Sequence, residues 1–241
     1  LLVESASETW SARALINASG TWTHPFWPRY PGQELFHGRQ LHTAQYVGPE
    51  EFAGQHVVVV GGGSSAVQLQ LEIAEVADVT WVTRREPLFT DEPFTQEIGR
   101  AVVARVDEAV RAGRPPASVV SVTGLFRTPQ VRVAQEAGLL DRLPMFDRIT
   151  ADGVVWDSGL EVRADAILWA TGFRPAIDHL APLGLRGVGG GIKLDGTRVV
   201  ADPRVHLVGY GPSASTVGAS RAGRAAVREI KELLAPALAA G

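Results

Sequence analysis

The sequence contains no cysteine. That absence excludes disulfides, thiolate metal sites and dithiol redox mechanisms from these 241 residues. Six histidines are present, but none has the spacing from other ligands that a metal site requires, so we expect no metal. They are His24, His37, His42, His56, His179 and His206.

Long apolar runs and strong net charge are also missing. No run reaches the roughly 18 apolar residues that a membrane span needs. A net charge of -3 gives no electrostatic reason to expect nucleic acid or an acidic membrane surface as a partner. The sequence opens Leu1-Leu2-Val3-Glu4, which is neither a signal peptide nor a starting methionine, so we expect a preceding piece to be missing. The cytoplasm is the default location.

What is present is an alternation of strand and helix patterns. Val57 to Val60 are four consecutive β-branched residues, as in a strand buried on both faces of a parallel sheet. Three prolines spaced three apart in residues 22–32 indicate an extended connector. The expected strands lie at 11–20, 57–60, 78–83, 153–156, 160–163, 166–170 and 205–208, and the expected helices at 64–77, 96–112 and 213–238. This pattern predicts an α/β fold.

A glycine-rich turn follows the valine strand directly. Residues 61–66 read Gly-Gly-Gly-Ser-Ser-Ala and fit G-x-G-x-x-A at the start of a helix. Gly61 makes the tight turn, Gly63 lets the backbone approach a pyrophosphate, and the small Ala66 lets helix and strand pack closely. The helix N-terminus supplies N–H donors, and Ser64 and Ser65 add hydroxyls. With strand, helix and second strand in place, we expect a dinucleotide to bind here.

The end of the second strand selects the dinucleotide. NAD sites usually carry an acidic residue there for the ribose 2'-hydroxyl, whereas arginine suits a 2'-phosphate. This sequence has Thr83-Arg84-Arg85, and the next acid is Glu86. Since a guanidinium binds a phosphate through charge-assisted hydrogen bonds, Arg84 and Arg85 predict NADPH.

A second constellation precedes the valine strand. Phe36, Gly38, His42 and Tyr46 match F-x-G-x-x-x-H-x-x-x-Y. On their own, such residues in a connector usually indicate packing. In this order, however, the segment resembles the fingerprint of the flavin-containing monooxygenases, the class B flavoprotein monooxygenases, which lies between their FAD and NADPH domains. Tyr46 precedes Val47, whereas the Baeyer–Villiger form usually has tryptophan followed by proline or aspartate. This difference favours the heteroatom-oxidising branch or a generic branch of the family.

Further segments agree with this resemblance in the family's order. Residues 10–32 resemble the end of the first FAD-domain segment. Residues 165–173 resemble the second Ala-Thr-Gly motif, which places Thr171 and Gly172 near a cofactor. Residues 208–212 resemble a turn near the flavin, which implies a role for Gly209, although many FAD enzymes have Gly-Asp where this chain has Gly-Tyr.

The resemblance implies two dinucleotide-binding, Rossmann-like domains, with an NADPH domain inserted into an FAD domain whose N-terminal part is missing. Residues 1–50 are expected to end the first FAD-domain segment and form a linker, 54–163 to bind NADPH, and 164–241 to return to the FAD domain. The implied reaction passes hydride from NADPH to FAD. One oxygen atom of dioxygen then goes to a small sulfur- or nitrogen-containing substrate. Because the cofactors carry this chemistry, no catalytic acid, base or nucleophile can be named.

Two alternatives remain open at this point. A relative of the pyridine nucleotide–disulfide reductases would share the two-dinucleotide architecture, but it needs a cysteine pair that these residues do not contain. A non-catalytic NADPH-binding, flavoprotein-like module would keep the glycine turn without turnover.

Overall fold

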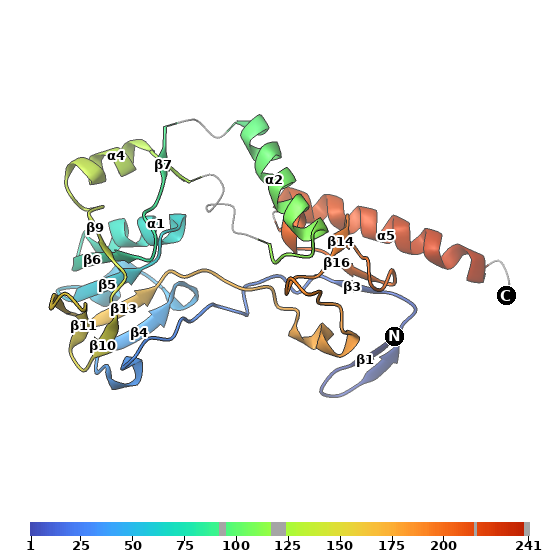
Figure 1. The fold of residues 1–241 in the computed structure, drawn as a ribbon, viewed down its shortest axis with the longest axis horizontal. Coiled ribbons are helices and arrows are strands. Elements are labelled where there is room, and N and C mark those ends of the chain that lie inside the picture. The colour runs from blue at the N-terminus through green and yellow to red at the C-terminus, as the bar shows by residue number, and fades with distance from the viewer. Residues whose placement is uncertain (92–94, 117–123, 215, 239–241) are drawn as a thin grey trace. The chain divides into compact units, whose positions relative to one another are not determined.

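The computed structural model describes residues 1–91, 95–116, 124–214 and 216–238 and shows two compact units (Figure 1). Both units are built from segments that are separated in the sequence. Unit 1 comprises Leu1–His24, Thr95–Ser118 and Pro175–Gly241, and unit 2 comprises Pro25–Phe94 and Val119–Arg174.

The centre of unit 2 is a five-stranded sheet in which every neighbouring pair is parallel. In spatial order its strands are β4 (Arg39–His42), β13 (Ala166–Trp169), β5 (His56–Val60), β6 (Asp78–Thr83) and β9 (Arg142–Pro144). The valines of β5 are at most 3% exposed. The prediction of a strand covered on both faces is therefore confirmed.

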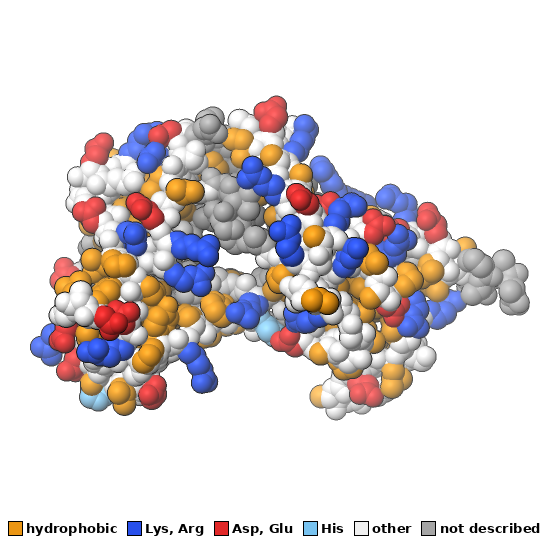
Figure 2. Space-filling view, viewed as in Figure 1, with side chains coloured by type: hydrophobic (Ala, Val, Ile, Leu, Met, Phe, Trp, Pro, Cys, Tyr) orange, Lys and Arg blue, Asp and Glu red, His pale blue; other side chains and the backbone are white. Residues whose placement is uncertain are grey.

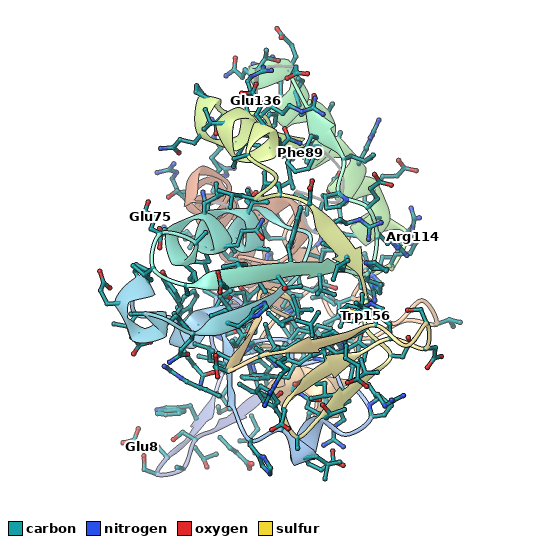
Figure 3. The ribbon with its side chains drawn as sticks, turned by 90° about the vertical axis from the view of Figure 1, so that its left-hand side faces the viewer. Glu8, Glu75, Phe89, Arg114, Glu136 and Trp156 are labelled. Carbon is teal, nitrogen blue, oxygen red and sulfur yellow. The ribbon has the colours of Figure 1, made fainter. Side chains whose placement is uncertain are left out.

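Different elements cover the two faces of this sheet. On one face, α1 (Ser64–Ile73) and α4 (Pro129–Glu136) pack against alternate residues of the strands, such as Val57 and Val59. On the other face, Val58 and Val60 meet an antiparallel sheet of three strands. These are β10 (Arg148–Thr150), β11 (Gly153–Val155) and β12 (Glu161–Arg163). Figure 3 shows the two layers, with Glu75 labelled beside α1 and Trp156 labelled on the side of the three-stranded sheet. A short parallel pair, β7 (Phe89–Thr90) and β8 (Leu125–Phe126), completes the unit.

Unit 1 has a smaller, mixed sheet of four strands in which only β16 and β3 pair in parallel. In spatial order they are β14 (Leu194–Asp195), β15 (Arg198–Val199), β16 (Val205–Leu207) and β3 (Leu15–Asn17). The unit also contains a hairpin of β1 (Leu2–Glu4) and β2 (Thr9–Ser11), and the helices α2 (Gln96–Arg111) and α5 (Thr216–Leu238). Val110 of α2 belongs to the core of this unit.

The division into units differs from the domain boundaries expected at residues 50, 54 and 163. β13 pairs with both β4 and β5, so strands from both sides of the expected boundaries belong to one sheet. α2, expected in the middle domain, belongs to unit 1, and its buried Val110 is part of the core of that unit.

Most expected elements are present with small changes at their ends. The strand at 78–83 is as predicted, and the helix expected at 64–77 ends at Ile73. The strand expected at 11–20 is reduced to Leu15–Asn17, since its backbone pairs with β16 over three residues only. Among the described residues, no helix has the length and apolarity to cross a bilayer, and no cluster of three or more potential ligands could hold a metal ion.

Candidate functional site

The glycine turn is fixed tightly at the carboxyl-terminal edge of the sheet of unit 2. Gly61 has φ +147°, and a Cβ there would lie 2.2 Å from the Ala170 carbonyl oxygen. Its amide donates to the Val82 carbonyl at 3.0 Å, and its carbonyl accepts from the Trp81 indole Nε1 at 2.7 Å. Only glycine fits this position, because both the backbone conformation and the space exclude a side chain.

The helix that follows begins without a cap. The first amide bonded within α1 is that of Val67, which donates to the Gly63 carbonyl at 3.2 Å, and Gly63 supplies no side-chain cap. The amides of Ser64, Ser65 and Ala66 have no acceptor among the described residues. A Cβ on Gly63 would meet no atom within 4 Å. The turn therefore presents N–H donors and a partial positive charge next to open space, as an anion site requires.

The loop after β6 lies beside this turn and carries Arg84 and Arg85. A Cβ on Gly62 would lie 3.9 Å from the Arg85 carbonyl oxygen. The loop is held by the buried Thr83, whose hydroxyl donates to that same carbonyl at 2.8 Å. Both arginines are exposed, and neither forms an ion pair with a carboxylate in the described part of the chain. Basic side chains gather at this edge of unit 2 in the space-filling view (Figure 2).

The proline-rich connector contributes Tyr30 to the same neighbourhood. The Tyr30 ring stacks on Trp169, with centroids 6.0 Å apart and planes 16° apart, and also contacts Phe146. Burial raises the pKa of the Tyr30 hydroxyl, and the positive charge of Arg84 acts in the opposite direction. Arg84 is thus within electrostatic reach of Tyr30. Sequence reasoning missed this aromatic residue, and its place between the evenly spaced prolines was the available signal.

The fingerprint residues pack inside unit 2. Phe36 belongs to its core, and a Cβ on Gly38 would lie 2.4 Å from the Asp165 carbonyl oxygen and 2.5 Å from the Phe36 ring. The Tyr46 hydroxyl donates to the Glu72 carboxylate at 2.9 Å, and its ring stacks on Phe52. Burial and this hydrogen bond raise the pKa of Tyr46. These residues join the connector to the sheet and to α1.

His42 is the buried polar member of the fingerprint. The Ala44 amide donates to His42 Nδ1 at 3.1 Å, so the ring proton is on Nε2, which donates to the Gly172 carbonyl at 3.0 Å. Burial lowers the pKa of His42, and the bond to Gly172 opposes that shift. His42 therefore lies in the structure as a neutral ring that holds the Gly172 turn.

The remaining predicted residues lie at two separate places. Thr171 and Gly172 follow β13 in unit 2, where the Thr171 hydroxyl donates to the Phe26 carbonyl and Gly172 has φ +77°. Gly209 lies in unit 1 with φ +81°. Its amide donates to the Ser213 hydroxyl at 3.0 Å. The structure thus brings the glycine turn, the two arginines and Thr171 to one sheet edge, while Gly209 is part of another unit.

Comparison with known proteins places this geometry in a family. A family model described as pyridine nucleotide-disulphide oxidoreductase matches residues 1–186. The flavin-containing monooxygenase from Stenotrophomonas maltophilia is 36% identical, with a TM-score of 0.74, over 94% of this chain and 64% of that chain. The indole-3-pyruvate monooxygenase YUCCA1 of Oryza sativa subsp. japonica is 26% identical over 198 residues, which are 69% of this chain and 48% of that protein.

A more distant structure agrees in fold alone. Thioredoxin reductase from Lactococcus lactis is 16% identical, with a TM-score of 0.62, over 96% of this chain and 70% of that chain. The chain spans about half the length of the curated relatives it matches. The fold class predicted from sequence, α/β with Rossmann-like dinucleotide-binding domains, is confirmed. The chain belongs to the pyridine nucleotide-disulphide oxidoreductase family and, within it, to the flavin-containing monooxygenases.

Proposed function

We propose that this chain is part of an FAD- and NADPH-dependent monooxygenase and that unit 2 is its NADPH-binding domain. Membership of the family implies use of FAD and NADPH. The pyrophosphate of NADPH lies against Gly61, Gly63, Ser64, Ser65 and Ala66. Its 2'-phosphate is bound by the two arginines of the following loop, Arg84 and Arg85.

One observation carries this proposal. The uncapped start of α1 faces open space at Gly63, and the adjacent loop carries two arginines that have no carboxylate partner among the described residues. Amide donors at a helix N-terminus suit a pyrophosphate, and unpaired guanidinium groups suit the additional 2'-phosphate. The residues present therefore fit NADPH better than NADH.

Thr171, Gly172 and Gly209 are proposed as contacts to the cofactors, on the resemblance of their segments to family motifs. Unit 1, which contains Gly209, is proposed to belong to the FAD domain. Bound flavin supplies the redox chemistry, and the protein binds, orients and excludes water. His42 contributes by holding the Gly172 carbonyl, which fixes the turn next to Thr171.

The substrate is proposed to be a small nucleophile containing sulfur or nitrogen, and the oxygen donor to be dioxygen. The Tyr46-Val47 ending of the fingerprint supports this choice over ketone oxidation. No nucleic acid or membrane partner is proposed. Of the alternatives, disulfide reduction lacks support because these residues contain no cysteine.

Turnover of the complete protein tests the function. Supplied with FAD, it is expected to be yellow and to consume NADPH and oxygen faster when a thioether or a tertiary amine is added. Cyclohexanone, a ketone of similar size, serves as the matched control and should have little effect. A preparation that binds NADPH but never consumes it would support the non-catalytic module, and stimulation by the ketone alone would reassign the substrate class.

A further inference from the structure

Arg142 begins the edge strand of the unit 2 sheet, far in sequence from the glycine turn. β9 pairs in parallel with β6, and Arg142 lies opposite Trp81. Paired residues of neighbouring strands point to the same face of a sheet. Arg142 is therefore on the face of Trp81 and α1, the face on which the Trp81 indole holds Gly61.

The Arg142 side chain reaches the end of β6. Its Nη1 donates to the Thr83 carbonyl at 3.4 Å, to the Thr83 hydroxyl at 3.3 Å and to the Leu143 carbonyl at 3.5 Å. The Thr83 hydroxyl in turn donates to the Arg85 carbonyl at 2.8 Å. A continuous series of hydrogen bonds thus runs from β9 to the loop that carries Arg84 and Arg85.

The charge of Arg142 has no counterpart in the described residues. The side chain is half-buried, and it forms no ion pair with a described carboxylate. A guanidinium has five N–H donors, and among the described residues only those on Nη1 have a partner. The loop that it supports carries Arg84 and Arg85, which likewise form no ion pair with a described carboxylate. Like charges gathered at one edge of a sheet repel each other unless an anion binds among them.

We propose that Arg142 is a positioning residue of the 2'-phosphate site and adds a third positive charge to it. It holds the backbone of the loop through Thr83, and its charge attracts the phosphate that Arg84 and Arg85 bind. This inference rests on the proposed NADPH site but assigns to it a residue from a different strand, outside the glycine turn and the arginine pair.

Two nucleotides that differ only in the 2'-phosphate test the proposal on the full chain. Adenosine 2',5'-bisphosphate and adenosine 5'-monophosphate are titrated by calorimetry, which needs no flavin and no turnover. Loss of one charge-assisted contact predicts a decrease of about tenfold in affinity for the bisphosphate in Arg142→Ala. Affinity for the monophosphate should fall by less than about twofold. Arg142→Lys should restore part of the loss, whereas the uncharged Arg142→Met should behave as alanine does.

Matched variants separate this role from a structural one. Arg148→Ala removes an exposed arginine from β10 of the same unit and should change neither affinity. Thr83→Val keeps the side-chain shape but breaks the hydrogen-bond series. It should therefore lower the affinity for the bisphosphate and leave the affinity for the monophosphate unchanged. Denaturant unfolding of every variant shows whether the unit remains folded.

The outcomes are distinguishable. One outcome is that Arg84→Ala and Arg85→Ala each lower the affinity for the bisphosphate selectively while Arg142→Ala does not. In that case the inference is overturned and the NADPH site stands. If Arg142→Ala loses affinity equally for both nucleotides and has a reduced unfolding free energy, the role of Arg142 is merely structural. If the unaltered chain binds the two nucleotides equally, both the inference and the proposed NADPH preference are wrong.

Discussion

Each unit has a turn after a parallel strand, and the two turns differ in whether their backbone amides have hydrogen-bond acceptors. In unit 1 the amides of Gly209 and Tyr210 donate to the Ser213 hydroxyl at 3.0 and 3.2 Å. In unit 2 the first amides of α1 have no acceptor among the described residues. Both turns need glycine, since both contain a positive φ.

The difference shows why a glycine turn alone does not define a nucleotide site. A turn whose donors are used by its own side chains has few left for a phosphate, whereas unsatisfied donors next to open space need an external partner. On this reasoning the turn of unit 2 is the better anion site. The following predictions test that contrast, beginning with the largest effect.

Gly61→Ala should break the turn of unit 2. The new Cβ meets the Ala170 carbonyl at 2.2 Å in a backbone conformation that alanine rarely adopts. We expect a loss of about 3 kcal/mol or more in unfolding free energy, measured with denaturant, together with loss of NADPH binding.

Gly63→Ala is the matched control in the same turn. Its Cβ meets nothing within 4 Å, so the unfolding free energy should fall by less than about 1 kcal/mol, the cost of alanine at a helix N-cap. NADPH affinity should still fall, because the methyl group occupies the space that the pyrophosphate needs. Unchanged affinity would contradict the close approach of the phosphates to Gly63.

Trp81→Phe removes the indole that holds the Gly61 carbonyl. Loss of this buried hydrogen bond should cost about 1–3 kcal/mol of unfolding free energy and weaken NADPH binding. Trp156→Phe removes a comparable buried bond, from the indole to the Pro144 carbonyl at 2.9 Å, on the opposite face of the sheet. It should cost a similar amount and leave NADPH affinity intact. If both variants lower NADPH affinity equally, Trp81 acts on the cofactor only through the stability of the unit.

Two buried histidines, one in each unit, predict an acid dependence of stability. Burial lowers the pKa of both His42 and His206. The unfolded chain therefore takes up protons first as the pH falls, so the stability from the neutral rings is present above about pH 6.5 and is lost below it. Among the described residues His206 Nε2 has no hydrogen-bond partner, whereas both ring nitrogens of His42 do.

Unfolding free energies at pH 7.5 and 5.5 measure this effect. His42→Gln and His206→Gln should each reduce the difference between the two pH values, even where they lower stability overall. A pH difference that neither substitution changes would assign the acid sensitivity to other groups.

Sequence reasoning located the parts of the site that are contiguous in the chain. The valine strand, the glycine turn and the arginine pair follow one another within about 30 residues, the length of a β-α-β unit, and their local patterns fix their structure. The expected helix at 96–112 was also found nearly in full, as Gln96–Arg111. Periodicity gives an element's type, but it does not say which core the apolar face joins. In the structure α2 belongs to unit 1 and not with the residues that precede and follow it in the chain.

Residues brought in by pairing between distant strands were not predictable. Arg142 reaches the site because β9 pairs with β6, and a single sequence does not reveal strand order. Tyr30 lies within electrostatic reach of Arg84, and the Trp81 indole donates to the Gly61 carbonyl. Neither interaction has a local sequence signature. Packing, the usual meaning of a histidine in a connector, does not name a partner for His42, and the structure gives that partner as the Gly172 carbonyl.

The central claim is that the glycine turn and arginine loop of unit 2 bind NADPH in preference to NADH. Equilibrium titration of the full chain with both cofactors, repeated on Arg84→Ala and Arg85→Ala, tests it most directly. We predict tighter binding of NADPH, and a loss of about tenfold or more in each variant for NADPH with little change for NADH. Equal binding of the two cofactors, or equal losses for both in the variants, would contradict the claim.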